Sequence, residues 1–199
     1  MHAVEQKVLS ISGVLLLMQV GKVLRRFPII DGREVVLRTP KGEDLDDLMD
    51  LINSLVNEKA EISRTVKVTR EEEAEWLSRM LARLEKDELF FLVAEVDGKL
   101  VASSDIQILH GDEKHVGVLG IAIKSGFRGL GIGTQMVETL SEQAAGLGLK
   151  ILTLNVFATN KRAIHVYEKV GFIQTGTIPK KHFREDQYID EVIMTKLID

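Results

Sequence analysis

A glycine-rich segment with one arginine is the part of the chain best suited to binding a phosphorylated ligand. It runs Gly126-Phe127-Arg128-Gly129-Leu130-Gly131-Ile132-Gly133-Thr134. Glycine has no Cβ, so the backbone N–H groups of such a turn can approach a ligand closely. The helical spacing that follows places a helix N-terminus at the same point, where partial positive charge favours anions. Arg128 adds a permanent cation, and the segment therefore predicts a phosphate-binding turn.

The spacing of these glycines separates the known kinds of phosphate-binding turn. A Walker loop requires a Gly-Lys-Ser/Thr ending, but Gly131 is followed by Ile132 and Gly133. A dinucleotide fingerprint requires a third glycine where Met136 stands. The remaining pattern is Arg-x-x-Gly-x-Gly. For this segment taken alone, a glycine-rich turn without a ligand is the alternative.

A second motif follows the apolar run 151–157. Its residues are Asn160-Lys161-Arg162-Ala163-Ile164-His165-Val166-Tyr167-Glu168-Lys169-Val170-Gly171-Phe172. In order and separation, the two motifs resemble the pyrophosphate loop and the Asn-x-x-Ala-x-x-x-Tyr-x-x-x-Gly-Phe segment of the GNAT N-acetyltransferases. The resemblance extends from Val35 to Leu197. The closing segment 180–192 is similar to that of the ribosomal-protein, amino-acid and polyamine acetyltransferase branches.

This resemblance implies an enzyme that uses acetyl-CoA as co-substrate and acetylates a primary amine by direct attack in a ternary complex. The amine would belong to a small molecule or a peptide. The pantetheine arm is expected along the backbone of Ile121, Ala122 and Ile123. Other coenzyme contacts are expected from Arg128, Gly129, Leu130, Gly131, Ile132, Gly133, Thr134 and Asn160. A non-catalytic acyl-CoA sensor or regulatory module is the alternative function, and transfer to a hydroxyl or of a longer acyl group is a second.

Tyr167 is the residue that the resemblance assigns as general acid. Acyl transfer from a thioester releases a thiolate, and a phenol with a pKa of about 10 can donate a proton to it. Helical spacing places Tyr167 on an inner face with Ala163 and Val170, so its hydroxyl needs a partner. A core tyrosine with an idle hydroxyl is the alternative. Asn160 is also expected to cap the helix that begins after it.

The chain departs from the family pattern at Asn155. Several peptide and ribosomal-protein acetyltransferases carry a glutamate there as general base, and asparagine cannot accept the proton. Among the substitutes His115 is favoured because histidine titrates near neutrality, although a solvated residue at a strand start is the better explanation of it. The other conceivable bases are His110, Asp105, Glu95 and Asp190. Water-mediated deprotonation, or an amine that binds neutral, also remains open.

Composition limits the classes of function. The 199 residues are sufficient for one domain with a substantial core, with 45% hydrophobic and 28% charged residues. The net charge of −4 argues against a nucleic-acid-binding protein. Without cysteine there is no disulfide, thiolate metal site or cysteine acyl-enzyme, and the five histidines show no metal-ligand spacing. The expected protein is a cytoplasmic enzyme without a metal.

The N-terminal extension, residues 1–33, exceeds what the family resemblance requires. Its apolar run from Val8 to Val20 is interrupted by Ser10, Ser12 and Gly13 and is too short to span a bilayer. No small-residue cleavage pattern follows it. We expect an added strand or helix that packs on the domain itself or on a neighbouring copy, as part of a homodimer contact.

The remaining pattern predicts one α+β domain over residues 34–199, with a mixed twisted sheet of about six to seven strands and about four helices. Strands are expected at 34–38, 89–96, 99–108, 116–123, 151–157, 172–178 and 187–197, with a loop at 179–187. Helices are expected from Leu45, after the capping box Thr69–Glu72, after the glycine turn, and over 160–170. By the family resemblance, the strands splay apart at the coenzyme site.

Overall fold

The computed structural model describes residues 20–198, and the apolar run 8–20 lies outside them except for its last residue. Eight strands form one sheet in the order β1-β2-β3-β4-β5-β6-β8-β7. The strands are β1 Val23–Pro28, β2 Glu34–Arg38, β3 Leu89–Val96, β4 Lys99–Ile108, β5 Val116–Ile123, β6 Ile151–Phe157, β7 Ile173–Arg184 and β8 Gln187–Leu197. The helices are α1 Leu45–Asn57, α2 Arg70–Leu84, α3 Ile132–Gly146 and α4 Lys161–Lys169.

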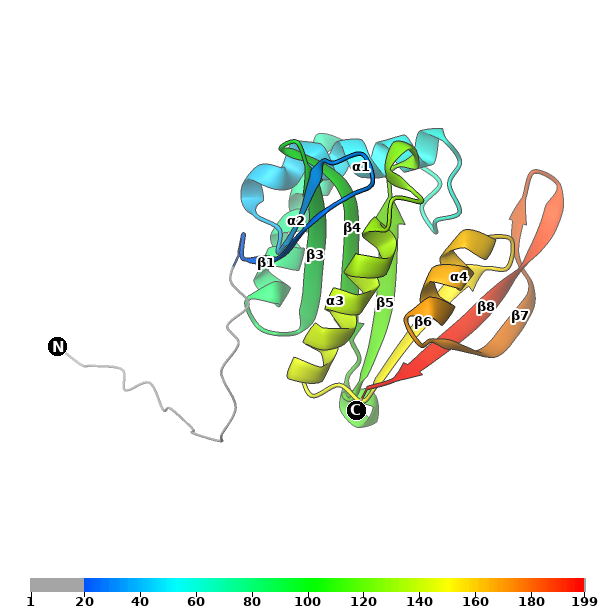
Figure 1. Cartoon of the computed structure of the whole chain (residues 1–199). Helices are drawn as coiled ribbons and strands as arrows, with labels where there is room; N and C mark the ends of the chain where they lie inside the picture. Colours follow the sequence, from blue (N-terminus) through cyan, green and yellow to red (C-terminus); the bar gives the residue numbers. More distant parts are fainter. Residues whose placement is uncertain (1–19, 199) are drawn as a thin grey trace.

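The sheet is mixed, because β5 and β6 pair in parallel and all other neighbours are antiparallel. α1 packs against α2. α3 packs against α4, and this second pair lies near the middle of the sheet (Figure 1). The core lies between the helices and strands β2 to β6 and β8. This arrangement confirms the expected α+β class. None of the four described helices combines the length and hydropathy that a bilayer span requires.

Local sequence explains the element boundaries in the first half of the chain. β3 and β4 meet at Asp97 and Gly98, whose φ angles of 51° and 73° suit the two-residue turn of a tight hairpin. On α1, Leu48, Leu51 and Leu55 are buried at helical spacing, so one face of this helix packs on the core. The expected boundaries of β2, β3 and β4 agree with the structure.

The C-terminal hairpin differs from the expectation. β7 continues to Arg184, and the predicted loop 179–187 is reduced to a turn at Glu185 and Asp186. Both turn residues have positive φ angles, 48° and 60°, as in a two-residue hairpin turn. The prediction was wrong because Pro179 and the run of basic residues resemble a loop, whereas pairing with β8 resumes at His182, beyond a register shift in which Lys180 has a positive φ angle of 54°. The hairpin extends beyond the rest of the sheet (Figure 1).

The described part of the N-terminal extension adds β1 to the edge of the sheet, antiparallel to β2. Arg25 on this strand reaches α3, where its guanidinium donates to Gln135 at 2.9 Å and to Glu142 at 2.7 Å. β1 brings the number of strands to eight. Residues 20–33 of the expected extension thus pack on the domain itself, whereas residues 1–19 of it lie outside the described residues.

Loss of the α2 capping box is expected to cost about 1 kcal/mol of the free energy of unfolding. Thr69 Oγ1 accepts from the Glu72 N–H at 3.2 Å, and the Thr69 N–H donates to Glu72 Oε2 at 2.9 Å. Urea unfolding of Thr69→Ala measures this cost. The exposed Thr65 provides the matched control, and equal midpoints for Thr69→Ala and Thr65→Ala would contradict the prediction.

Candidate active site

The only parallel strand pair of the described sheet opens along its length. β5 and β6 are in register over Val116–Val118 and Ile151–Thr153 only. Beyond that point β5 stays paired with β4 as far as Ile123, while β6 stays paired with β8 as far as Phe157. The backbone edge of Leu119–Ile123 therefore has no partner on β6. A cavity of about 1090 Å³ fills the opening.

The glycine-rich turn forms one wall of this cavity. Gly129 and Gly131 adopt φ angles of 80° and 86°, which favour glycine, and Gly131 is the N-cap of α3. The first turn of α3 contains no acidic residue, whereas the first turns of α1 and α2 both do. The positive end of the α3 dipole is thus left for an anion from outside the chain.

The predicted coenzyme-binding residues divide into two groups. Those that line the cavity are Ile121, Ala122, Ile123, Arg128, Gly129, Gly131, Gly133, Thr134 and Asn160. Leu130 and Ile132 do not line it: Leu130 packs against the core from a partly buried position, and Ile132 belongs to the core. These two side chains anchor the turn to the core, while the glycines on either side of them line the cavity.

Arg128 has contacts within the chain as well as a place in the cavity wall. Its Nε donates to the carbonyl of Ile123 at 2.8 Å, and its Nη2 pairs with the Glu58 carboxylate. Both contacts hold the turn between the end of β5 and the end of α1. Arg128 therefore braces the glycine-rich turn in addition to contributing positive charge to the cavity wall.

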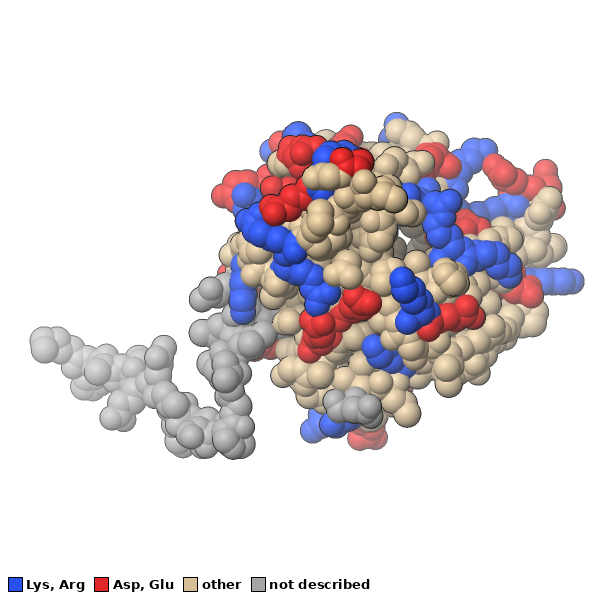
Figure 2. All heavy atoms as spheres, in the orientation of Figure 1, with Lys and Arg blue, Asp and Glu red and all other residues tan. Residues whose placement is uncertain are grey.

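Further cationic side chains line the large cavity. Lys161, Arg162 and Lys169 of α4 line the cavity, and Lys and Arg side chains lie around the region between α3 and α4 (Figure 2). Asn160 caps α4, because its Oδ1 accepts from the Ala163 N–H at 3.1 Å. The helix N-terminus, the open β5 edge and these cations fit the phosphates and the extended pantetheine amide chain of coenzyme A.

Tyr167 lies on α4 and also lines the cavity, although only 6% of its surface is exposed. Within residues 20–198 its hydroxyl has no hydrogen-bond partner. Burial raises the pKa of the Tyr167 phenol above its ordinary value of 10. The side chain is therefore protonated at neutral pH and can donate a proton to a group bound in the cavity.

The candidate bases are scattered. Asn155 lines the cavity, but His115 does not. His115 is exposed and precedes β5, whereas the glycine turn follows the other end of that strand. A strand rises about 3.3 Å per residue, so roughly 25 Å separate His115 from Ile123. His110, Glu95 and Asp190 also lie outside the cavity wall.

Asp105 is the one acid among the predicted bases that the fold brings to the cavity. It pairs in register with Gly120 across β4 and β5. Burial raises its pKa above the ordinary value, and a hydrogen bond from Gln107 and the charge of Arg83 offset part of this effect. Arg83 Nη1 in turn donates to Gln107 Oε1 at 2.7 Å.

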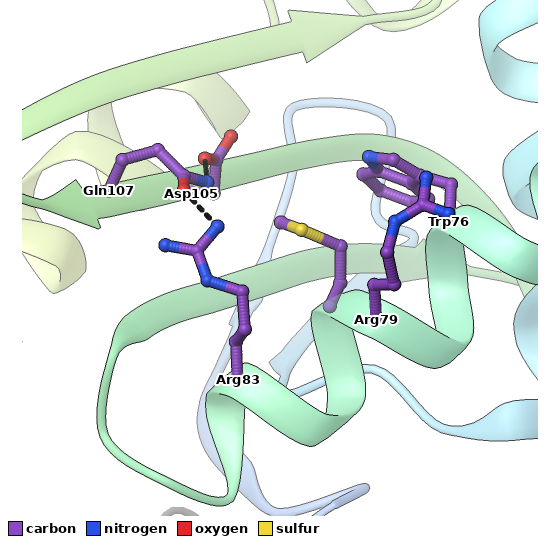
Figure 3. A pocket seen from close by; sticks show the side chains of 6 residues that line it. Trp76, Arg79, Arg83, Asp105 and Gln107 are labelled. Carbon is purple, nitrogen blue, oxygen red and sulfur yellow. Dashed lines mark hydrogen bonds between the residues drawn. The ribbon is translucent and has the colours of Figure 1, made fainter.

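Asp105 also lines a second, smaller cavity of about 380 Å³ between α2 and β4. Figure 3 shows Trp76, Arg79 and Arg83 on α2 facing Asp105 and Gln107 on β4. Asp105 therefore borders both cavities, and the two arginines give the smaller one a positive wall.

Two acids in the large cavity, Glu61 and Glu191, were absent from the predicted site. Glu61 lies in the connection between α1 and α2, where no motif marks it. Glu191 stands in the strand pattern of β8, and its burial depends on neighbours more than thirty residues away in the chain. No group of three or more metal-binding side chains occurs within residues 20–198.

Comparison with known proteins agrees with this geometry. The sequence profile of the Acetyltransferase (GNAT) family matches residues 52–172. The chain is 31% identical over 108 residues to the L-amino acid N-acetyltransferase AaaT of Escherichia coli strain K12, covering 53% of this chain and 67% of that protein.

Solved structures show the same fold. A GNAT-family acetyltransferase from Streptococcus pneumoniae superposes with a TM-score of 0.74 at 26% identity, over 83% of this chain and 99% of the other. The ribosomal-protein-alanine N-acetyltransferase of Brucella melitensis gives a TM-score of 0.72 at 25% identity, over 81% and 98%. Since the family profile covers more than half of the residues, the chain belongs to the GNAT family and is an acetyl-CoA-dependent N-acetyltransferase.

Proposed function

We propose that this enzyme transfers the acetyl group to a primary amine by direct attack within a ternary complex. The acceptor is an amino acid, a peptide or protein N-terminus, or a polyamine. The observation that carries the proposal is the position of Tyr167 in the wall of the opened β5–β6 cavity, together with the glycine turn. The chain has no cysteine, which suits transfer without a cysteine acyl-enzyme.

Each part of the site has a distinct task in this proposal. The α3 N-terminus, Arg128 and the cations of α4 hold the coenzyme phosphates. The open backbone edge of Leu119–Ile123 holds the pantetheine arm by main-chain hydrogen bonds. Acetyl-CoA supplies an activated acyl carbon and a thiolate leaving group. Tyr167 donates the proton that neutralises this thiolate, and the burial that raises its pKa keeps it protonated until then.

The charges that line the two adjoining cavities support an acceptor amine that also carries a carboxylate. The acids of the large cavity, Glu61, Asp105 and Glu191, offer negative charge to an ammonium group, whereas Arg79 and Arg83 in the adjoining cavity offer positive charge to a carboxylate. An amino acid carries both groups. The name of the Escherichia coli relative points to the same class of acceptor, whereas that of the Brucella melitensis relative names an alanine of a ribosomal protein.

A panel of amines tests the proposal. Acetyl-CoA is supplied with L-amino acids, a peptide with an N-terminal alanine, and spermidine, while free thiol release is followed and acetylated products are identified by mass spectrometry. We expect turnover with at least one amine, and faster turnover with acceptors that carry a carboxylate. Tight coenzyme binding without acetylation of any amine would contradict the proposal and favour a sensor.

A further inference from the structure

Glu191 on β8 is a buried carboxylate in the wall of the coenzyme cavity. Only 7% of its surface is exposed, yet it lines the cavity. One oxygen, Oε1, lies 3.1 Å from Nε2 of His182 on the neighbouring strand β7. The His182 ring stacks on Phe157 of β6, with ring centroids 3.9 Å apart and planes at 20°. His182, packed against Phe157, therefore fixes the position of this carboxylate oxygen.

Strand register places Glu191 on the same face of the sheet as Asn155. Phe157 pairs directly with Glu191, and Asn155 pairs directly with Ile193. Direct antiparallel partners project on the same side, and so do residues two apart on one strand. Glu191 is thus the diagonal neighbour of Asn155, about 7–8 Å away between backbones, within reach of a long side chain. A carboxylate therefore lines the cavity near Asn155, but it comes from Glu191 on β8 and not from β6.

The other oxygen of Glu191 has an open hydrogen-bonding position. Oε2 is buried and accepts no hydrogen bond from residues 20–198, and its nearest cation is Lys181 Nζ at 3.7 Å. Within residues 20–198, Gln143 Oε1 and Glu191 Oε2 are the two buried side-chain polar atoms without a hydrogen-bond partner, and of these two residues only Glu191 lines the cavity. A buried carboxylate oxygen without a donor is costly unless a ligand supplies one.

We propose that Glu191 is the general base that deprotonates the acceptor amine, and that His182 is the positioning residue that orients it. This inference rests on the proposed acetyl transfer to an amine. It assigns to β8 the carboxylate that Asn155 cannot provide on β6.

The proton balance of the step is complete. Glu191 accepts one proton from the bound ammonium group, and the neutral nitrogen forms a C–N bond to the thioester carbon. The C–S bond breaks, and Tyr167 donates its proton to the departing sulfur. The second proton of the nitrogen restores the Tyr167 phenol through water. Glu191 then releases its proton to solvent, so the reaction yields an amide, a free thiol and one proton.

Other titratable or charged groups near Glu191 also affect how kcat/KM depends on pH. They are Lys181 and His182 on β7, Arg184 near Phe157, Glu61 and Arg64 in the α1–α2 connection, Asp105 on β4 and Tyr167 on α4. The test therefore compares rate ratios between variants across pH, because the titration of these groups is common to both members of each ratio.

The experiment measures kcat/KM for wild type and Glu191→Gln from pH 6 to pH 10, with the fastest acceptor of the amine panel as probe. General bases contribute about 10²–10⁴-fold, so we expect a deficit of at least 100-fold at pH 7. The deficit falls to about tenfold or less at pH 10, because about half of an amine with a pKa of about 10 is then neutral without a base. Coenzyme affinity, measured by calorimetry, stays unchanged.

Three further variants make the result specific. Glu191→Asp keeps a carboxylate, and its deficit is smaller than that of Glu191→Gln at pH 7. His182→Gln lowers kcat by about tenfold with unchanged coenzyme affinity and with the same decline of the deficit toward high pH. Glu185→Gln, at the exposed turn of the same hairpin, retains wild-type rates.

A Glu191→Gln deficit that does not change with pH overturns the inference alone, as does a pH-dependent deficit in Asp105→Asn with none in Glu191→Gln. If Glu191→Gln does not fold, a pH-dependent deficit in Glu191→Asp and His182→Gln supports the inference, and wild-type profiles in both overturn it. A wild-type enzyme that binds acetyl-CoA but acetylates no amine overturns the proposed function and this inference together.

Discussion

Tyr167→Phe is expected to lower kcat by about 10²–10⁴-fold while leaving coenzyme affinity unchanged. The substitution removes only the hydroxyl, which has no hydrogen-bond partner within residues 20–198 and belongs to a ring that lines the cavity. Without this proton donor, the sulfur must leave as a thiolate. The rate of free thiol release gives kcat, and calorimetric titration with coenzyme A gives the affinity.

Phe172, whose ring centroid lies 5.9 Å from that of Tyr167, distinguishes chemistry from packing. Phe172→Leu disturbs the same aromatic contact but removes no hydroxyl, so its stability falls while kcat at a permissive temperature remains near that of wild type. Wild-type turnover by Tyr167→Phe would show that the proton comes from another group. Loss of coenzyme binding in this variant would instead assign Tyr167 to structure.

Gly133→Glu is expected to weaken coenzyme A binding by at least about 100-fold, because it puts a carboxylate at the anion-binding end of α3. Like charges in close contact cost several kcal/mol, and each 1.4 kcal/mol corresponds to a factor of ten. The Cβ alone is tolerable: it would lie 3.2 Å from Ile123 Cδ1, the flexible end of a side chain. Calorimetry on the folded variant measures the loss.

Two controls separate charge from shape. Gly133→Ala adds the Cβ without the charge, and its dissociation constant should lie within about tenfold of the wild-type value. Gly146→Glu introduces the same carboxylate at the other end of α3, where a Cβ has open space. Unchanged coenzyme affinity in a folded Gly133→Glu protein would disprove the assignment of the phosphates to this turn.

Several features of the fold and site could be predicted from sequence because their causes lie within a few residues. The turn at Asp97 and Gly98 defines β3 and β4, and the pair Thr69 and Glu72 begins α2. The glycine-rich turn likewise depends on residue types that permit positive φ angles. Local conformational preference is sufficient in each case, so the family motifs appear as continuous segments of sequence.

Other features depended on contacts between distant residues. β7 reaches Arg184 because its pairing with β8 resumes at His182, beyond a register shift that contains Lys180, although the composition of residues 179–184 resembles a loop. The opening between β5 and β6 arises because each strand continues along a different neighbour. No local signal encodes either outcome.

The acid–base groups show the same division. Sequence alone predicted Tyr167 as the general acid, and it also showed that Asn155 cannot serve as a base. It favoured His115, which the tertiary structure places at the far end of β5, outside the cavity. Glu191 reaches the cavity only because β8 lies beside β6 in the sheet. Strand order and register decide which side chains share a face, and these depend on the packing of the whole chain, whereas a motif depends only on its own residues.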